Sequence, residues 1–224
     1  SRMQQASISE FFEKNKHFLG FDTLQRSIIT AVKESVDNSL DACEEARYLP
    51  TIEIEIHKVP GKSDELLMIS QDNGPGIPPD AITRVFGSLL LGSRFHAIRQ
   101  TRGQQGIGIT GVVMYSQLTT GKHTHVISKV EEEATAVHLD IGLDTKKNKA
   151  ISSRRKREHW FDAEGELIPH GVRVEARMKA KYQRGKQSVY QYLRMTSIVN
   201  PHASISFRVF DEDGAIIDGG DWPR

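Results

Sequence analysis

Hydrophobic positions recur with a helical period in the segment from about Leu24 to Arg47. At about 100° per residue, they form one apolar stripe made of Ile28, Val32, Val36, Leu40 and Cys43. A polar stripe lies nearly opposite and contains Glu34, Asn38 and Asp41. Solvated helix faces favour long side chains such as Glu and Lys, whereas Asn, Asp and Ser are poor helix formers. The pattern predicts a packed helix whose polar face meets water or has a separate task.

The remaining chain alternates between strand-like and helix-like patterns. Apolar and polar residues alternate at 51–59 and 66–71, and the Pro- and Gly-containing turn between them predicts a β-hairpin. Further strands are predicted at 126–130, 134–141, 172–178 and 204–210. Helices are predicted at 80–88, 109–118 and 187–198, and Ser7 with Glu10 forms a capping box for a helix that ends at Gly20.

This order of elements predicts an α+β fold. Neighbouring strands that pair as hairpins indicate a mixed, mostly antiparallel sheet, with the helices collected on one face as a two-layer α/β sandwich. Residues 1–20 form an aromatic N-terminal arm that packs on its own core or on a partner subunit. Residues 21–224 form the domain proper.

Composition narrows the class of protein. The chain has 224 residues, of which 38% are hydrophobic, so it can build a core without staples. Its lone cysteine, Cys43, lies on the apolar stripe, which predicts a buried thiol and a reducing compartment. No apolar run reaches the roughly 18 residues of a membrane span, and the first residues lack a signal-peptide core. We therefore expect a cytoplasmic protein.

The net charge of +1 gives no global attraction to nucleic acid, so such contacts would need a local patch. One basic run exists, between Lys146 and Arg157. It is interpreted as the solvated tip of a hairpin, with a phosphate-binding patch as the alternative.

Two glycine-rich motifs suggest phosphate binding but do not fit. Gly61-Lys62-Ser63 lacks the first glycine of a Walker loop, because Ile56 stands in its place. The run from Gly106 to Gly111 has the spacing of a dinucleotide fingerprint, but the segment before it is polar and Arg-rich rather than a strand.

Three stretches together resemble the motifs of the GHKL ATPases, the superfamily of gyrase, Hsp90, MutL and the sensor histidine kinases. Glu34 to Ala42 matches its E-x-x-x-N-x-x-D-A box, Asp72 to Gly76 its D-x-G-x-G box, and Gly103 to Gly108 its glycine-rich lid. Within the superfamily, residues 6–220 are similar to the B subunits of type IIB DNA topoisomerases (topoisomerase VI). The resemblance implies the Bergerat-type sandwich and an ATP-hydrolysing domain.

The resemblance also implies a role for each motif residue. Glu34 would be the general base, Asn38 a Mg²⁺ ligand, and Asp41 a residue that orients Asn38 or its neighbours. Asp72 would accept from the adenine amino group, with Gly74 and Gly76 allowing close approach of the backbone. The residues that would close over and hold the phosphates are Ser93, Arg94, Arg102, Gly103, Gln104, Gln105, Gly106, Ile107, Gly108 and Ile109.

The resemblance implies ATP and Mg²⁺ as cofactors, a homodimer formed on ATP binding, a DNA-cleaving A subunit and double-stranded DNA as partners. Two departures stand out. In His170-Gly171-Val172 the family has Thr where this chain has Val172, so a hydroxyl that supports Asp72 is missing. The chain also ends at Arg224, before a transducer domain that would supply a phosphate-contacting Lys. The alternative hypothesis is a degenerate, non-hydrolysing scaffold of the same fold.

Overall fold

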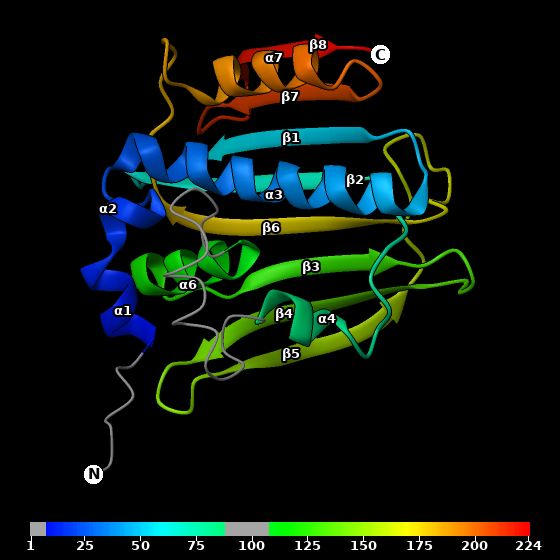
Figure 1. Ribbon diagram of the computed structural model, residues 1–224, viewed down its shortest axis with the longest axis horizontal. Coiled ribbons are helices and arrows are strands. Elements are labelled where there is room, and N and C mark those ends of the chain that lie inside the picture. The colour runs from blue at the N-terminus through cyan, green and yellow to red at the C-terminus, as the bar shows by residue number, and fades with distance from the viewer. Residues whose placement is uncertain (1–7, 88–107) are drawn as a thin grey trace.

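The computed structural model describes residues 8–87 and 108–224 (Figure 1). Ser7, whose hydroxyl was to cap the first helix, lies outside the described residues. So do most of the predicted phosphate-binding residues: Ser93, Arg94, Arg102, Gly103, Gln104, Gln105, Gly106 and Ile107.

One sheet of eight strands runs through the molecule in the order β5-β4-β3-β6-β2-β1-β7-β8. The strands are β1 (Thr51–Lys58), β2 (Glu65–Asp72), β3 (Thr124–Lys129), β4 (Ala136–Asp144), β5 (Lys149–Glu158), β6 (Gly171–Lys179), β7 (Ser204–Phe210) and β8 (Ile216–Trp222). Of the seven neighbouring pairs among the described strands, only β1 with β7 is parallel. The predicted mixed, mostly antiparallel sheet is confirmed.

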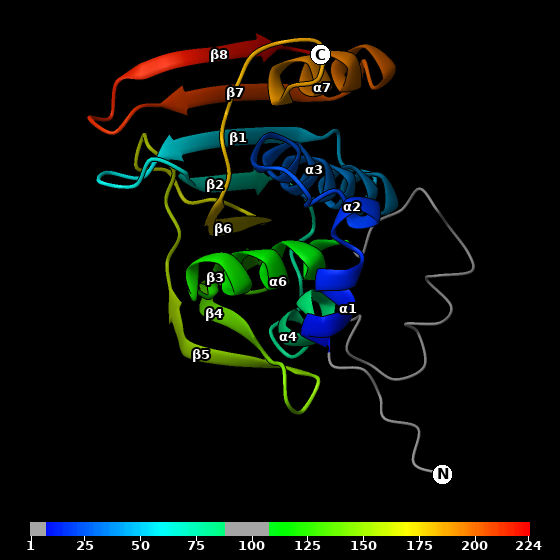
Figure 2. The same ribbon diagram turned by 90° about the vertical axis from the view of Figure 1, so that its left-hand side faces the viewer.

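The helices gather on one face of this sheet, as the edge-on view shows (Figure 2). They are α1 (Ile8–Lys14), α2 (Lys16–Leu19), α3 (Leu24–Ala46), α4 (Ile82–Phe86), α6 (Ile109–Thr120) and α7 (Val189–Val199). The main core lies between the two layers and includes Val32, Ile54, Val113 and Leu139. The predicted α+β two-layer sandwich is confirmed. No helix in the described part of the chain is long and apolar enough to cross a membrane.

Helix α3 is the long helix that the apolar stripe predicted. Thr23 caps it by accepting a hydrogen bond from the Arg26 N–H, and Arg47 ends it in the left-handed conformation at φ 62°. On the predicted stripe, Ile28, Val32, Val36 and Cys43 are at most 1% exposed. The prediction of a buried thiol is confirmed, and burial raises the pKa of the Cys43 thiol to about 12.

The N-terminal arm forms two short helices, α1 and α2, rather than one. Phe12 of the arm and Phe21 directly after it are buried, and the Phe21 ring stacks on Tyr115 of α6 at 4.6 Å between centroids, whereas Phe18 is exposed. Packing on its own core, one of the two interpretations of this arm, is confirmed for Phe12 and Phe21. A role of the arm as a dimer strap stays a prediction.

The interpretation of the basic run as a solvated hairpin tip is confirmed only in part. Only residues 145–148 form the turn, and Lys149–Glu158 form β5, an edge strand whose residues are mostly exposed. The apolar alternation that reveals a strand arises from one buried face, and β5 buries almost none of its side chains. Strand β8 was missed for a related reason, because its residues are exposed or only half-buried.

Candidate nucleotide-binding site

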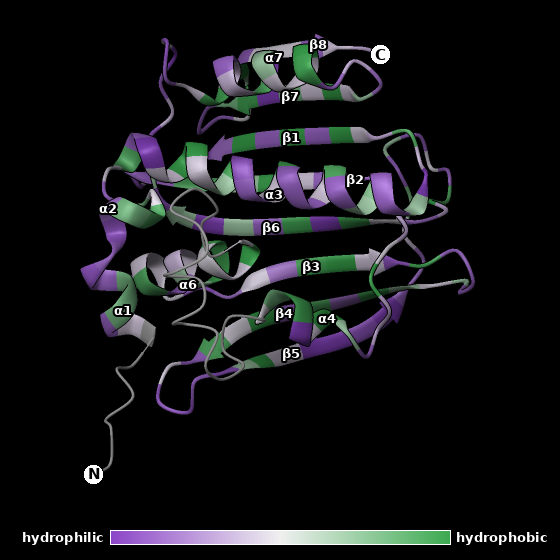
Figure 3. Ribbon diagram, viewed as in Figure 1, coloured by the Kyte–Doolittle hydropathy of each residue, from purple (hydrophilic) through white to green (hydrophobic). Residues whose placement is uncertain are grey.

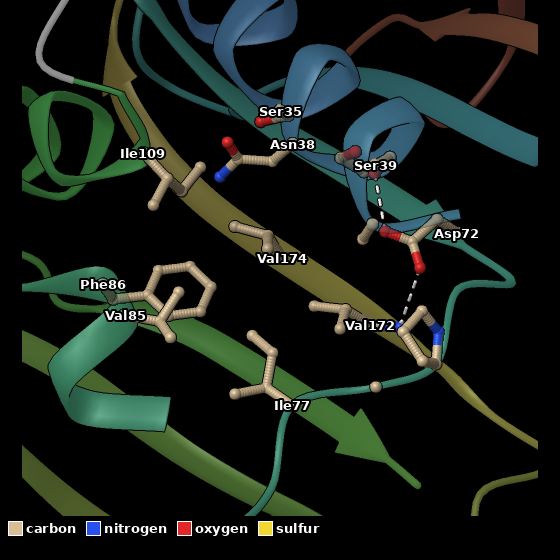
Figure 4. Close-up of a pocket in the computed structure, with 14 residues that line it drawn as sticks. Ser35, Asn38, Ser39, Asp72, Ile77, Val85, Phe86, Ile109, Val172 and Val174 are labelled. Atoms are coloured by element: carbon tan, nitrogen blue, oxygen red, sulfur yellow. Dashed lines mark hydrogen bonds between the residues drawn. The ribbon is translucent and has the colours of Figure 1, made fainter. Parts of the chain in front are cut away.

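A cavity of about 210 Å³ opens between α3, the loop after β2, α4 and the start of α6 (Figure 4). The inward faces of β2 and β6 form its floor. It is lined by Ser35, Asn38, Ser39, Ala42, Ser70, Asp72, Pro75, Gly76, Ile77, Val85, Phe86, Ile109, Val172 and Val174. The α3 box, the loop after β2 and Ile109, the last of the predicted phosphate-holding residues, therefore contribute to one pocket.

The α3 side of the pocket is built from small and amide side chains. Ser35, Asn38, Ser39 and Ala42 follow the i, i+3, i+4, i+7 spacing of one helix face. The predicted stripe of Glu34, Asn38 and Asp41 was therefore displaced by about one residue. Glu34 is half-buried and Asp41 exposed, and neither lines the cavity. Small residues on this face let a ligand approach the helix closely.

Asp72 is the polar centre of the pocket floor, and only 9% of it is exposed. Its Oδ2 accepts from the Ser39 hydroxyl at 2.6 Å, and its Oδ1 accepts from the backbone N–H groups of Gly74 at 2.9 Å and Val172 at 3.2 Å. A carboxylate has about four acceptor directions. Among the described residues three are used, which leaves one on Oδ2 for a donor in the cavity.

Burial raises the pKa of Asp72, and the three hydrogen bonds oppose that rise because they favour the ionised form. This carboxylate therefore carries a desolvation cost. A purely structural residue would rarely retain such a cost, since a buried charge without a cationic partner weakens the fold.

Val172 lacks the hydroxyl that was expected to support Asp72, as predicted, but a side chain on another element supplies one. Val172 contributes its backbone N–H to Asp72, and the hydroxyl comes from Ser39 on α3. The sequence motifs did not reveal Ser39, because they assign functions only to Glu34, Asn38 and Asp41 of this helix. One signal in the sequence could have indicated Ser39. Ser35 and Ser39 lie one turn apart on the same helix face, although serine is a poor helix former.

The two glycines after Asp72 have different tasks. Gly76 adopts φ 76°, and a Cβ there would lie 2.1 Å from the Lys129 carbonyl oxygen, so the loop can pass β3 only as glycine. Gly74 has no positive φ and does not line the cavity; its N–H instead fixes Asp72. Ser128 on β3 holds the same loop by donating to the Ile77 carbonyl at 2.8 Å and accepting from its N–H at 2.7 Å.

The walls around Asp72 are apolar. Figure 4 shows Val174 and Val172 on the floor, with Ile77, Val85, Phe86 and Ile109 facing them across the cavity. A single hydrogen-bond acceptor at the end of an apolar slot suits a flat heteroaromatic group with one exocyclic donor. The cavity is smaller than the roughly 300–1,000 Å³ typical of whole-ligand sites. The polar part of a larger ligand would therefore lie at the rim, where Asn38 is exposed.

A profile of the histidine kinase-, DNA gyrase B- and HSP90-like ATPases matches residues 23–145, which include α3, the Asp72 loop and α6. The chain belongs to this ATPase family. The GHKL resemblance of the sequence motifs is thereby confirmed.

Several relatives carry the name of the B subunit of type 2 DNA topoisomerase 6. One from Archaeoglobus fulgidus is 50% identical over 95% of this chain. Another, from Methanococcoides burtonii, is 49% identical over 97% of this chain. The chain spans 34% of the length of each. Among solved structures, the Aquifex aeolicus MutL ATPase domain complexed with ADP is similar at 19% identity and a TM-score of 0.48, covering 88% of this chain and 64% of that one.

Within this GHKL domain, Glu34 lies on α3 one turn before Asn38. Burial raises the pKa of its carboxyl group, and the negative charge of Asp37 raises it further, while Lys33 acts in the opposite sense. A carboxylate with a raised pKa is a stronger base than an exposed glutamate. Glu34 thus has the electrostatic environment of a general base, although its predicted catalytic role remains untested.

Asn38 is the residue of the GHKL site that could hold Mg²⁺. No cluster of three or more acidic, His or Cys side chains in the described ranges could hold a metal ion by itself. A single amide oxygen fits Mg²⁺ that keeps several waters and shares phosphate oxygens, since this ion is rarely enclosed by protein ligands alone. Asp41 makes no hydrogen bond to Asn38 within the described parts of the chain, so its predicted orienting role gains no support.

The phosphate end of the GHKL site begins at Gly108 and Ile109. Gly108 precedes α6 at φ 65°, with open space where a Cβ would lie, and Ile109 is the first residue of the helix. Helix α6 therefore begins where the predicted lid ends in the sequence, and the first turn of a helix carries unpaired N–H groups that suit phosphate. The other lid residues lie outside the described residues.

Proposed function

We propose that this chain is the ATP-binding and ATP-hydrolysing domain of a type IIB DNA topoisomerase B subunit. The observation that carries the proposal is the Asp72 carboxylate, buried at the floor of an apolar cavity with one acceptor direction open. The similarity to topoisomerase 6 B subunits at 45–50% identity supports the choice within the ATPase family.

In this proposal the adenine ring lies between the apolar walls and donates its amino hydrogen to Asp72 Oδ2. Asn38 at the rim contributes an oxygen to Mg²⁺, which when bound neutralises phosphate charge. Glu34, one helical turn away, orients and deprotonates the water that attacks the γ-phosphoryl group. The lid from Arg102 to Ile109, with Ser93 and Arg94, closes over the phosphates and supplies backbone N–H donors.

We propose the wider function by similarity to these relatives. ATP-dependent dimerisation of two B subunits would gate the passage of a DNA duplex, and a separate A subunit would cut the DNA. The N-terminal arm would contribute to the dimer contact. These are properties of the whole assembly, of which this chain matches about a third of one subunit.

The decisive test compares Glu34→Gln with the parent in the assembled topoisomerase. The variant should keep Mg²⁺-dependent binding of a non-hydrolysable ATP analogue and lose at least ~100-fold in turnover, because glutamine cannot accept the proton. Unchanged turnover would remove Glu34 from the role of base. A parent that binds no ATP analogue by calorimetry would instead favour the non-hydrolysing scaffold.

A further inference from the structure

The strand β5 and the turn before it concentrate positive charge. Residues 146–157 contain seven Lys and Arg and no acidic residue, whereas the whole chain has a net charge of +1. The rest of the chain therefore carries a formal charge of −6. A polyanion would therefore be attracted to this strip more than to the chain as a whole.

The strip lies at the edge of the sheet (Figure 1). Among the described strands β5 pairs only with β4, and Figure 3 shows much of it as hydrophilic. A bulge interrupts its pairing opposite His138 and Asp140, and there Arg154 takes φ 52° with its side chain 87% exposed. The bulge turns a long cationic side chain out of the regular alternation of the strand.

Protection against edge-to-edge aggregation explains part of this design, since charges and bulges on edge strands prevent pairing with another chain. Such protection needs only scattered charges, often lysines, and does not require seven cations without an acidic residue among them. Some cations have acidic neighbours: Arg154 lies 3.8 Å from Asp140, Lys156 lies 3.1 Å from Glu158, and Arg157 pairs with Glu133. Such exposed pairs contribute little and leave the local excess of positive charge in place.

We propose that β5 and the turn 145–148 form a contact surface for the phosphate backbone of a DNA duplex. A strand of ten residues extends roughly 33 Å, about one helical turn of B-form DNA. Cations that project on both sides of the free edge can reach phosphates on either side of a groove. The inference rests on the proposed function and names where its DNA partner would lie.

The same strand contacts the wall of the nucleotide cavity. Arg155 donates to the Pro79 carbonyl at 3.1 Å, just before α4, and a Cβ on Gly87 at the end of α4 would come within 2.3 Å of the Ala150 Cβ. Helix α4 places Val85 and Phe86 in the cavity. A duplex held on β5 therefore acts on a strand that packs against the nucleotide-binding wall, and its binding should raise ATP turnover.

The test uses the assembled topoisomerase with a triple neutralised variant, Lys149→Gln, Arg154→Asn and Lys156→Gln. Asparagine is chosen at 154 because it tolerates the left-handed conformation, and the structural contacts of Arg155 and Arg157 remain. The matched control neutralises three exposed cations elsewhere: Lys62→Gln, Lys122→Gln and Arg194→Gln. A fluorescent 30-base-pair duplex is titrated at several salt concentrations, and ATP turnover is measured with and without it.

For the triple variant, the slope of log affinity against log salt should become shallower by ~2.7, at about 0.9 per lost phosphate contact. DNA stimulation of turnover should fall while basal turnover stays at the parental value. An unchanged slope, or an equal change in the control, would overturn the inference. A parent without ATP turnover in the same assay would instead indicate failure of the proposed function.

Discussion

The Ser39 hydroxyl and the Asp72 carboxylate lie 2.6 Å apart and join α3 to the end of β2 beneath the cavity. Both side chains are buried, at 4% and 9% exposure. The bond fixes one oxygen of Asp72 and leaves its remaining acceptor direction toward the cavity. It also makes the position of the Asp72 carboxylate depend on the helix that carries Glu34 and Asn38.

We expect Ser39→Ala to weaken both the fold and nucleotide binding. Removing a donor to a buried carboxylate costs about 1.5–3 kcal/mol in the free energy of unfolding. The affinity for an ATP analogue should fall as well, because Asp72 loses one of its fixed contacts. The control is Ser35→Ala, since the Ser35 hydroxyl also faces the cavity but donates to the Ala31 carbonyl. Urea denaturation and calorimetry should separate the two variants; equal losses would argue against a special role for Ser39.

Asp72→Asn should bind nucleotide poorly while folding well. The amide oxygen can still accept from the N–H groups of Gly74 and Val172, and the amide NH₂ can donate to Ser39. No acceptor then remains for the amino group of adenine. An ATP analogue should bind at least ~10-fold more weakly in calorimetry, at a cost of one hydrogen bond to a charged acceptor.

The same substitution should change the pH dependence of stability. Burial raises the folded pKa of Asp72 above its ordinary value of 3.8. The native state then binds the proton more tightly than the unfolded state, so this group favours folding below pH ~3.8 and loses that contribution as pH rises through the folded pKa. Urea denaturation between about pH 4 and pH 8 should show the parent losing stability relative to Asp72→Asn. A constant difference across this range would contradict the raised pKa.

The sequence predicted the elements that have one buried face. The 3.6-residue period of α3 and the alternation in β1 identify residues that pack on a core, and these predictions agree with the structure within a few residues. Strand β5 escaped because its exposed side chains have no periodicity to read. The capping box at Ser7 could not be assessed, because that residue lies outside the described residues.

The site was predicted in its chemistry more than in its geometry. Asp72 and Asn38 line the cavity as expected, because motif spacing places them on a strand end and a helix face. Ser39 was missed because its role depends on the distance between α3 and β2, which only the packed structure fixes. Gly74 was assigned to backbone approach, yet its N–H holds Asp72 instead.

Asp37→Asn should shift the pH profile of ATP turnover in the assembled topoisomerase. The charge of Asp37 adds to the effect of burial in raising the pKa of Glu34. Without that charge the pKa of Glu34 falls. Turnover should still decrease at acid pH, but the midpoint of that decrease should lie at a lower pH than in the parent. Asp41→Asn is the control, because Asp41 is exposed and its charge is absent among the causes of the Glu34 shift. A limb that stays in place for Asp37→Asn would show that burial alone sets the pKa of the base.

Gly76→Ala should damage the site far more than an alanine at another left-handed glycine. Gly76 has φ 76°, and its new Cβ would lie 2.1 Å from the Lys129 carbonyl oxygen, so the loop must move away from β3. Gly121 has a similar φ of 72° but open space around the added atom. Gly121→Ala should therefore cost only the backbone strain, about 1–2 kcal/mol. Gly76→Ala should lower the free energy of unfolding by more, as measured by urea denaturation. It should also weaken ATP-analogue binding, because the loop that moves contains Ile77, which lines the cavity. Equal losses of stability with unchanged binding would show that the loop tolerates displacement and that its contact with β3 does not shape the pocket.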